Sequence, residues 1–440
     1  MKSNIRRALS LVMAAIILLS LAGCTASEGP NGNGGTNDSG QNTAPGIRSS
    51  VVTDLMKDIK PSKPAEDPDA IRKNVSKAAD FAIRLLKASR TEEGQNLLIS
   101  PLSVLYALAM TANGAEKNTL AQMEEVLGMS RSELNSFILS YSKCLPQADE
   151  YKLKLANSIW FTDHQRFTVN NDFLQKVAGY YDAEIYKTSF DDKNAAKNTI
   201  NKWVEDHTDS MIPEIIDDIP DSIIMYLINA LAFKAQWQEE YSPDMVQDGT
   251  FTQEDGQTQD AKLMYSTENS FISTDKATGF IKTYKDGKYA FAALLPNEGV
   301  TVSELVESLD GETISKLLAY PQDTEVQAAI PKFEAGSFMQ MSEILKGMGM
   351  PDAFDADLAD LSGLGTSTGG NLFISRVLHK TYISVDEKGT KAGASTAVEV
   401  VDKAIFEPLQ VILDRPFVYM LVDCTTNIPF FIGTMESLGQ

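Results

Sequence analysis

Hydrophobic positions recur along the chain with two different periods. Residues 67–89 repeat them at helical spacing, and helix starts are indicated by Ser100 with Pro101 and by the capping-box pair Thr119 and Gln122. Strands are predicted where apolar residues alternate or run together, at 153–161, 225–233, 290–296, 326–333, 381–385 and 415–422. Because no linker interrupts these elements after residue 67, we expect one mixed domain of about 370 residues.

One strand-like pattern is written in residues that form strands poorly. The run GTKAGASTAVEVVDKAIFEP spans residues 389–408. When it is read by period two, one side carries Thr390, Ala392, Ala394 and Thr396. Alanine and glycine have low strand propensity, and small side chains bury little area. We interpret the run as a segment that stays outside a sheet and is able to slide into one later.

The N-terminus has the parts of an export signal. A basic start, MKSNIRR, precedes the apolar stretch ALSLVMAAIILLSLAG, and LAGC ends it. LAGC resembles the bacterial lipobox, so we predict a lipoprotein signal peptide at residues 1–23 and lipidation of Cys24, with an ordinary secretory peptide as the alternative. Residues 24–66 are predicted to be a flexible tether, because the Gly-, Asn- and Ser-rich segment offers little to bury. The folded domain is then expected at residues 67–440.

The composition is acidic, with a formal net charge of −21. This charge disfavours nucleic acids and anionic membrane surfaces as partners, so we expect contact with a membrane only through the lipid. Two further cysteines, Cys144 and Cys424, are too few for a disulfide framework. We expect both to be buried small hydrophobic residues.

Catalytic and metal-binding patterns are missing from the sequence. The three histidines, His164, His207 and His379, are widely separated, and no HExxH, CxxC, GxSxG or phosphate-loop motif occurs. We interpret His207 as a solvated residue at a helix end. The sequence therefore predicts no enzyme, no metal site and no cofactor.

Five blocks of the sequence, in order, resemble the serpins, a family of serine protease inhibitors. They are NLLISPLSVLYALAMTANGAEKNTLAQM (96–123), LINALAFKAQW (227–237), IPKFE (330–334), LHKTYISVDEKGTKAGAST (378–396) and RPFVYMLVDCTTNIPFFIGTM (415–435). The resemblance implies an α+β fold with three β-sheets, about nine helices and an exposed reactive-centre loop. It also implies a suicide mechanism, in which a protease cleaves the loop, forms an acyl-enzyme and is distorted when the loop inserts into the central sheet.

The resemblance assigns roles to residues by position. The loop hinge would be Gly389, Thr390, Ala392, Gly393, Ala394 and Thr396, and Lys391 replaces the glutamate that is usual in the family. The polar cluster beneath the strands that must part would be Ser100, Ser103, Asn229 and His379. The point where the loop inserts would be marked by Trp237 and by the ion pair of Lys332 with Glu387, a surface pair worth only about 0–1 kcal/mol.

The bond that a protease cleaves is placed by counting along the loop. Counting from Gly389 as in inhibitory serpins gives Lys403–Ala404, and a lysine there would fill the acidic specificity pocket of a trypsin-like protease. Counting back from Pro416 gives Ile405 instead. Ile405 or Phe406 would indicate an elastase-like, subtilisin-like or chymotrypsin-like target.

The resemblance and the N-terminus together predict a monomeric serpin on the extracellular face of a bacterial cell membrane, held by its lipid and otherwise secreted. Its partner would be a serine protease in a covalent acyl complex, with a cysteine protease as an alternative. Two other interpretations stay open, a non-inhibitory serpin that acts as a binding module and an extracellular solute-binding lipoprotein.

Overall fold

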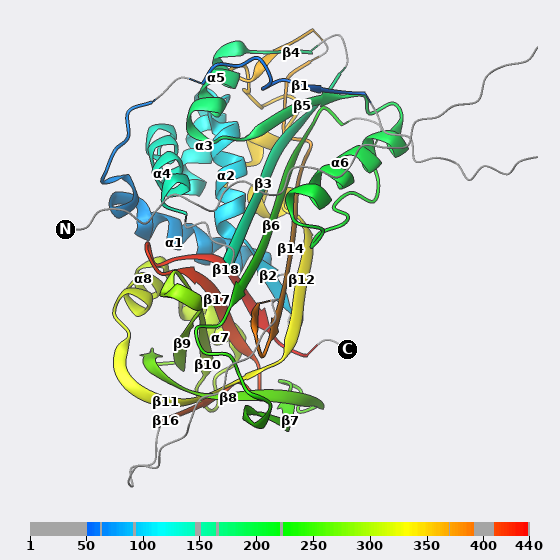
Figure 1. Ribbon diagram of the computed structural model, residues 1–440. Coiled ribbons are helices and arrows are strands. Elements are labelled where there is room, and N and C mark those ends of the chain that lie inside the picture. Colours follow the sequence, from blue (N-terminus) through cyan, green and yellow to red (C-terminus); the bar gives the residue numbers. More distant parts are fainter. Residues whose placement is uncertain are drawn as a thin grey trace, which may run out of the picture. The chain divides into compact units, whose positions relative to one another are not determined.

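A seven-stranded β-sheet runs through the centre of the computed structural model (Figure 1). Residues 51–61, 64–90, 94–145, 151–163, 167–220, 223–368, 370–390 and 409–438 are described, and one compact unit spans Ile47–Gln440. In spatial order the strands are β1 (Val52–Asp54), β5 (Glu184–Thr188), β3 (Tyr151–Thr162), β6 (Met225–Gln236), β15 (Gly389–Thr390), β14 (Arg376–Asp386) and β12 (Phe333–Gln340).

Both faces of the seven-stranded sheet are covered, as the side chains of β6 show. Leu227 and Leu231 join the main core, on the face where α2 (Pro101–Ala112) packs. Tyr226 and Ile228 point the other way and join a smaller core with residues of α6 (Lys193–His207), which lies beside the sheet in Figure 1. This two-sided burial explains why β6 is apolar at nearly every position rather than at every second one.

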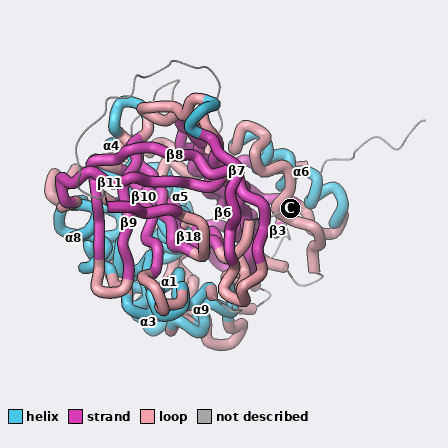
Figure 2. The backbone as a smooth tube through the Cα atoms, turned by 90° about the horizontal axis from the view of Figure 1, so that it is seen from below, coloured by secondary structure: helices cyan, strands magenta, loops and turns pink. Residues whose placement is uncertain are grey.

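A second continuous set of nine strands packs below the first sheet, and Figure 2 shows several of its strands lying side by side. One part contains β7 (Val246–Thr252), β8 (Thr258–Ser273), β11 (Gln322–Pro331) and β16 (Leu409–Ile412). The other contains β9 (Ala277–Thr283), β10 (Tyr289–Pro296), β17 (Phe417–Asp423), β18 (Ile428–Met435) and β2 (Leu97–Ile99). Only Phe271–Ser273 of β8 pairs with β9, so the set divides naturally into two sheets.

The remaining elements complete a mixed fold. A small ladder pairs β13 (Gly365–Ser367) with β4 (Phe167–Val169). Besides α2 and α6, the described residues form α1 (Ala70–Ser89), α3 (Lys117–Leu127), α4 (Arg131–Cys144), α5 (Asn171–Tyr180), α7 (Val302–Ser308), α8 (Gly311–Ala319) and α9 (Ser342–Met348). Short 3-10 turns occupy Pro243–Met245, Lys285–Gly287 and Pro351–Phe354.

The folded region begins earlier than the sequence predicted. Residues of β1 pair with Tyr186–Thr188 of β5, and Leu55, Met56 and Ile59 pack against the main core. The assignment of residues 51–66 to the tether is therefore wrong for the described part of that segment. Strand β1 was not predicted because it is fixed only by pairing with β5, which is distant in the sequence.

Two local expectations were also wrong. Helix α3 begins at Lys117, so Thr119 lies inside it, and the Thr119 hydroxyl accepts the Asp360 N–H at 2.9 Å instead of capping the helix. Gln122 accepts the Asp352 N–H at 3.0 Å.

The expectation that both cysteines are buried is also wrong. Cys144 is exposed at the end of α4, whereas Cys424 is partly buried, and the two thiols are free.

Candidate functional site

The central contact of the seven-stranded sheet is a parallel pairing of β6 with β14, which we call the seam. Residues Arg376–Tyr382 lie beside Tyr226–Ala232. Towards the end of β14 the two strands separate, and β15 lies between them. It is antiparallel to both, with Thr390 opposite Ala235 on one side and Val385 on the other. The first residues of the run at 389–408 therefore lie between the C-terminal ends of β6 and β14.

Gly389 lies where the chain approaches β6 most closely. Its φ is +141°, and a Cβ atom there would come within 2.1 Å of the Ala235 carbonyl oxygen. Only glycine avoids this clash with backbone atoms, which cannot rotate away as a side chain would. The backbone geometry thus requires glycine at the start of the hinge.

Thr390 is completely buried, with 0 % of its surface exposed. Its Oγ1 lies 2.8 Å from the hydroxyl oxygen of Tyr284 on the turn after β9. The Tyr284 ring in turn stacks on Trp237, with ring centroids 4.4 Å apart and planes 5° from parallel. Trp237, assigned to the point of insertion, is therefore connected to the hinge through Tyr284.

Hydrogen bonds to its backbone carbonyls, together with one ion pair, hold the turn that joins β14 to β15. The indole Nε1–H of Trp237 donates to the Asp386 carbonyl at 2.9 Å, and its backbone N–H donates to the Lys388 carbonyl at 3.0 Å. The backbone N–H of Tyr241 donates to the Glu387 carbonyl at 2.9 Å. Lys332 forms a half-buried ion pair with the Glu387 carboxylate. Although partial burial opposes ionisation, this ammonium helps to hold the pKa of Glu387 below its usual range.

The four residues assigned to the polar cluster come together where β6 and β14 pair. The Ser100 N–H donates to His379 Nε2 at 2.9 Å, and the Ser100 hydroxyl accepts the Ser103 N–H as the N-cap of α2. Asn229 donates its amide hydrogens to the Ser103 carbonyl and to Asn157 Oδ1 of β3. The cluster therefore joins α2 to three neighbouring strands, β3, β6 and β14.

The hydrogen bonds of the cluster define the protonation state of His379. The amide nitrogen of Asn229 faces two acceptors, so its oxygen faces His379 Nδ1, 2.6 Å away, which must carry the proton. Nε2 is then the acceptor for the Ser100 N–H. A second proton would remove that acceptor. Complete burial also lowers the pKa of His379 to about 3.

Acidification should destabilise the folded chain through His379. The unfolded imidazole binds a proton near a pKa of about 6.5, whereas the folded one stays neutral until about 3. The stability linked to His379 is therefore complete above about pH 6.5 and is lost as the pH falls towards 3, at about 1.4 kcal/mol per pH unit. Heat-unfolding midpoints measured between about pH 7 and pH 5 should show this decline.

The variant His379→Gln provides the comparison for that measurement. Glutamine does not titrate in this range, so its unfolding midpoint should vary less with pH than that of the wild-type chain. Carboxylates contribute equally to both curves and cancel in the difference. Parallel curves for the two proteins would show that His379 is not held neutral in the folded state.

His207 lies at the end of α6, as predicted, and its side chain is 38 % exposed, but it also contacts the sheet. Its Nε2 lies 3.3 Å from Glu184 Oε1 on β5, and its ring stacks on Trp203 with centroids 4.2 Å apart. The neighbouring carboxylate raises the pKa of His207, and the hydrogen bond from His207 helps to lower the pKa of Glu184 to about 2. The contact fastens the end of α6 to the sheet.

Other predicted site residues lie outside the described residues: Ala392, Gly393, Ala394, Thr396, Lys403, Ala404, Ile405, Phe406 and Cys24. Sequence reasoning missed Tyr284, Tyr241 and Asn157. Tyr284 lies in the polar stretch KTYKDG, where nothing local distinguishes a tyrosine that contacts the hinge from one at the surface.

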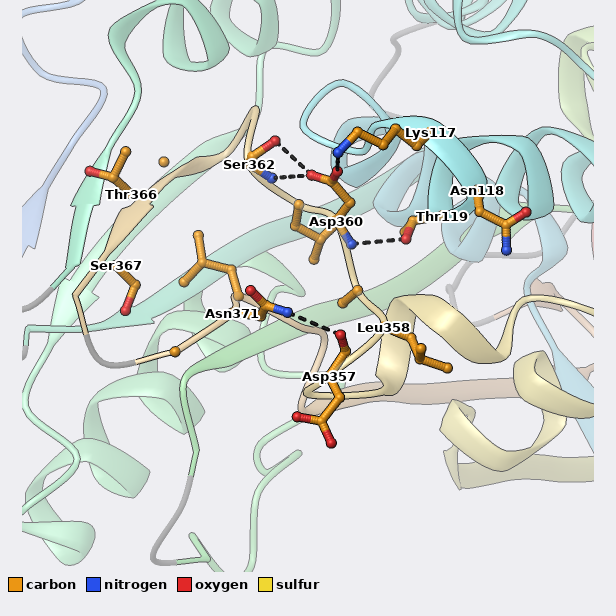
Figure 3. A pocket seen from close by; sticks show the side chains of 15 residues that line it. Lys117, Asn118, Thr119, Asp357, Leu358, Asp360, Ser362, Thr366, Ser367 and Asn371 are labelled. Atoms are coloured by element: carbon orange, nitrogen blue, oxygen red, sulfur yellow. Dashed lines mark hydrogen bonds and ion pairs between the residues drawn. The ribbon is translucent and has the colours of Figure 1, made fainter.

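A separate polar pocket of about 560 Å³ opens between the start of α3 and residues 357–372 (Figure 3). The Asp360 carboxylate accepts hydrogen bonds from Lys117 at 2.9 Å and from the Ser362 hydroxyl at 2.6 Å. Because these groups satisfy one another, they act as a structural brace for the loop.

Among the described residues, no group of three or more His, Cys, Asp or Glu side chains is placed to hold a metal ion. No helix in that part of the chain has the length and apolar character needed to cross a membrane.

Comparison with known proteins places this fold and hinge in a family. The model of the family described as Serpin (serine protease inhibitor) matches residues 76–438. Neuroserpin of Mus musculus is 28 % identical over 372 residues, which cover 80 % of this chain and 89 % of neuroserpin. The chain therefore belongs to the serpin family, a family of protease inhibitors and not of enzymes. The predicted α+β fold with three sheets and nine helices is confirmed.

Solved structures of serpins also resemble this chain. The thermophilic serpin tengpin in its native state is 44 % identical with a TM-score of 0.83, covering 88 % of this chain and 100 % of tengpin. Tengpin in its latent state is 43 % identical with a TM-score of 0.74, covering 86 % and 100 %. Human thyroxine-binding globulin complexed with its hormone is 26 % identical with a TM-score of 0.75, covering 84 % and 100 %.

Proposed function

We propose that this serpin is an irreversible suicide inhibitor of a serine endopeptidase, acting through insertion of its cleaved loop into the seam. The observation that carries the proposal is the position of Gly389 and Thr390, which already pair with β6 and β14 at once. Residues that follow Thr390 continue in the same direction if only these two strands part. The polar cluster beneath β6 and β14 would be the contact that has to rearrange.

Insertion has a sufficient driving force. Adding about ten residues between two strands forms on the order of ten backbone hydrogen bonds, each worth roughly 1 kcal/mol net. This sum rivals the total stability of an ordinary domain, roughly 5–15 kcal/mol, so a form with the loop outside would be metastable. The greater likeness to native than to latent tengpin supports a resting state of that kind.

The proposed bait is the Lys403–Ala404 bond. A serine oxygen of the protease would attack the Lys403 carbonyl carbon, and the amine of Ala404 would leave with the C-terminal fragment. The ester to Lys403 would then remain on the protease while the hinge inserts. A lysine side chain fits the acidic pocket of a trypsin-like enzyme, whereas cleavage at Ile405 or Phe406 would select a different protease class.

Mixing the chain from residue 25 onwards with trypsin tests this function. We expect a complex that survives a denaturing gel, together with a released fragment whose mass begins at Ala404. Cleavage at Ala404 without a complex would contradict inhibition of trypsin, and the same test with subtilisin and elastase would then decide whether the chain inhibits any of these proteases.

A non-inhibitory binding role is the second candidate, favoured by the likeness to thyroxine-binding globulin. The hinge residues argue against it, because Gly389 to Thr396 contains neither proline nor a bulky apolar side chain that would obstruct insertion. Cleavage of the loop should raise the heat-unfolding midpoint if the loop inserts. An unchanged midpoint after cleavage would favour the binding role.

We also propose that the protein is anchored to the outer face of a bacterial membrane through lipid on Cys24. The motif LAGC and the Gly- and Asn-rich segment that follows it support this location. Replacing Cys24 with alanine should abolish incorporation of labelled fatty acid and release the chain from the membrane fraction. A Cys144→Ala variant is the matched control and should keep its label, and labelled Cys24→Ala protein would exclude this anchor.

A further inference from the structure

A buried charge lies directly behind the hinge. Lys282 of β9 is only 3 % exposed, and its ammonium forms an ion pair with Glu268 of β8 at 2.9 Å. The Glu268 carboxylate also accepts the Ser266 hydroxyl at 2.7 Å. Lysine is rarely buried to this extent unless it is paired, and the Glu268 carboxylate is its partner here.

Two aromatic rings surround the ammonium of Lys282. The nitrogen lies 4.6 Å from the centroid of the Tyr241 ring and 5.5 Å from that of the Trp237 ring, both within the range of a cation–π contact. The rings themselves meet edge to face, with centroids 6.4 Å apart. Lys282, Tyr241 and Trp237 therefore form one cage, in which the cation attracts both rings.

The two rings belong to the residues that hold the turn before the hinge. Trp237 donates to the carbonyls of Asp386 and Lys388, and the Tyr241 backbone donates to that of Glu387. Trp237 also stacks on Tyr284, whose hydroxyl contacts Thr390. Every one of these contacts lies between the cage and the first residues of the loop.

Stability alone does not explain a lysine at this position. Replacing a buried ion pair with apolar residues of similar volume is often neutral or stabilising, because desolvation of the charges offsets their attraction. A hollow of about 170 Å³ borders both Lys282 and Glu268, so packing from that side does not fix them. The cation contributes something that an apolar residue would not, namely directional attraction on two rings.

We propose that Lys282 is a positioning residue that sets how far the loop rests in the seam before cleavage. Its cation fixes Trp237 and Tyr241 against residues 386–388, the turn that leads into β15. Without it the turn loosens, and the uncleaved loop enters the seam spontaneously. This inference rests on the proposed insertion mechanism, and it concerns the resting state rather than the encounter with a protease.

The test compares three variants of the full chain with the wild-type chain. Lys282→Met removes the cation, Lys282→Arg keeps it, and Lys285→Met removes an exposed lysine nearby as the matched control. Each protein is held just below its unfolding midpoint. The fraction that has become resistant to heat, yet is uncut on a denaturing gel, is followed with time by circular dichroism.

In Lys282→Met the heat-resistant, uncut form should appear about 5- to 30-fold faster, the change expected for loss of a desolvated cation–π contact. Lys282→Arg and Lys285→Met should convert at the wild-type rate. Equal rates for Lys282→Met and the wild-type chain, or equal acceleration in Lys285→Met, would overturn the inference. So would failure of arginine to rescue, or conversion to aggregate in place of a heat-resistant form.

A second variant separates the cage from the unpaired acid that Lys282→Met leaves behind. Lys282→Met combined with Glu268→Gln removes both charges, and the inference requires the same acceleration in it. The readout uses no protease, so its result does not depend on finding the target. Absence of a complex with any protease would count against the proposed function, whereas unchanged conversion rates would count against the role of Lys282.

Discussion

Replacing Thr390 with arginine should turn the inhibitor into a substrate. Thr390 is completely buried between Ala235 and Val385, and its hydroxyl contacts Tyr284. None of these neighbours can pair with a guanidinium, and burying an unpaired charge costs several kcal/mol. The arginine should therefore keep the hinge out of the seam, so that the protease completes hydrolysis before the loop inserts.

The effect should be visible as a change in stoichiometry. Full inactivation of trypsin should require at least about tenfold more of the Thr390→Arg chain than of the wild-type chain. A barrier of a few kcal/mol changes the ratio of the insertion rate to the hydrolysis rate by at least that factor. Thr390→Ser keeps the hydroxyl and should behave like the wild-type chain. If the arginine variant still trapped trypsin at the wild-type ratio, Thr390 would not occupy the seam during inhibition.

Loss of the lysine at position 403 should remove the recognition of trypsin. In Lys403→Met the acidic pocket of the protease would be left without its cationic partner, and sites built for a specific polar group reject analogues that lack it by about 10⁴-fold. We expect the rate of complex formation with trypsin to fall by about 10³- to 10⁴-fold. Stopped-flow measurement of trypsin inactivation checks this.

The control for that experiment is Lys391→Met, which removes the same charge from the same loop. Because Lys391 lies far along the sequence from the proposed bait bond, its loss should leave the rate nearly unchanged. The Lys403→Met chain should also keep its heat-unfolding midpoint. An undiminished rate for Lys403→Met would move the bait bond to Ile405 or Phe406.

The sequence predicted the parts of the fold that carry local signals. The apolar runs became β3, β6, β10, β11, β14 and β17, and Ser100 caps α2 as expected. By contrast, β1 was missed, because three residues at a sheet edge have no periodicity to read and are fixed only by pairing with β5. The capping motif at Thr119 was misread because the loop at Asp360 competes for the same hydroxyl.

The residues of the candidate site likewise fall into two groups, those that were predicted from the sequence and those that were not. Ser100, Ser103, Asn229 and His379 were grouped only through the resemblance to a family, since nothing in their spacing along the chain brings them together. Lys282 and Tyr284 were not found. Both lie on β9 or the turn after it, and their contacts with the hinge depend on how two different sheets pack against each other.

The direction of the strands at the seam limits how often one molecule of this protein can act. β6 and β14 are parallel, whereas a strand that continues from Thr390 is antiparallel to both, so insertion exchanges one parallel ladder for two antiparallel ones. Antiparallel pairing is the slightly more stable arrangement per residue, and nothing in the sheet favours the return of the strand to water. Each copy can then act once. Under the proposed mechanism, the inhibitory capacity of a preparation equals its number of uncleaved copies, and it declines with every protease molecule trapped until new synthesis restores it.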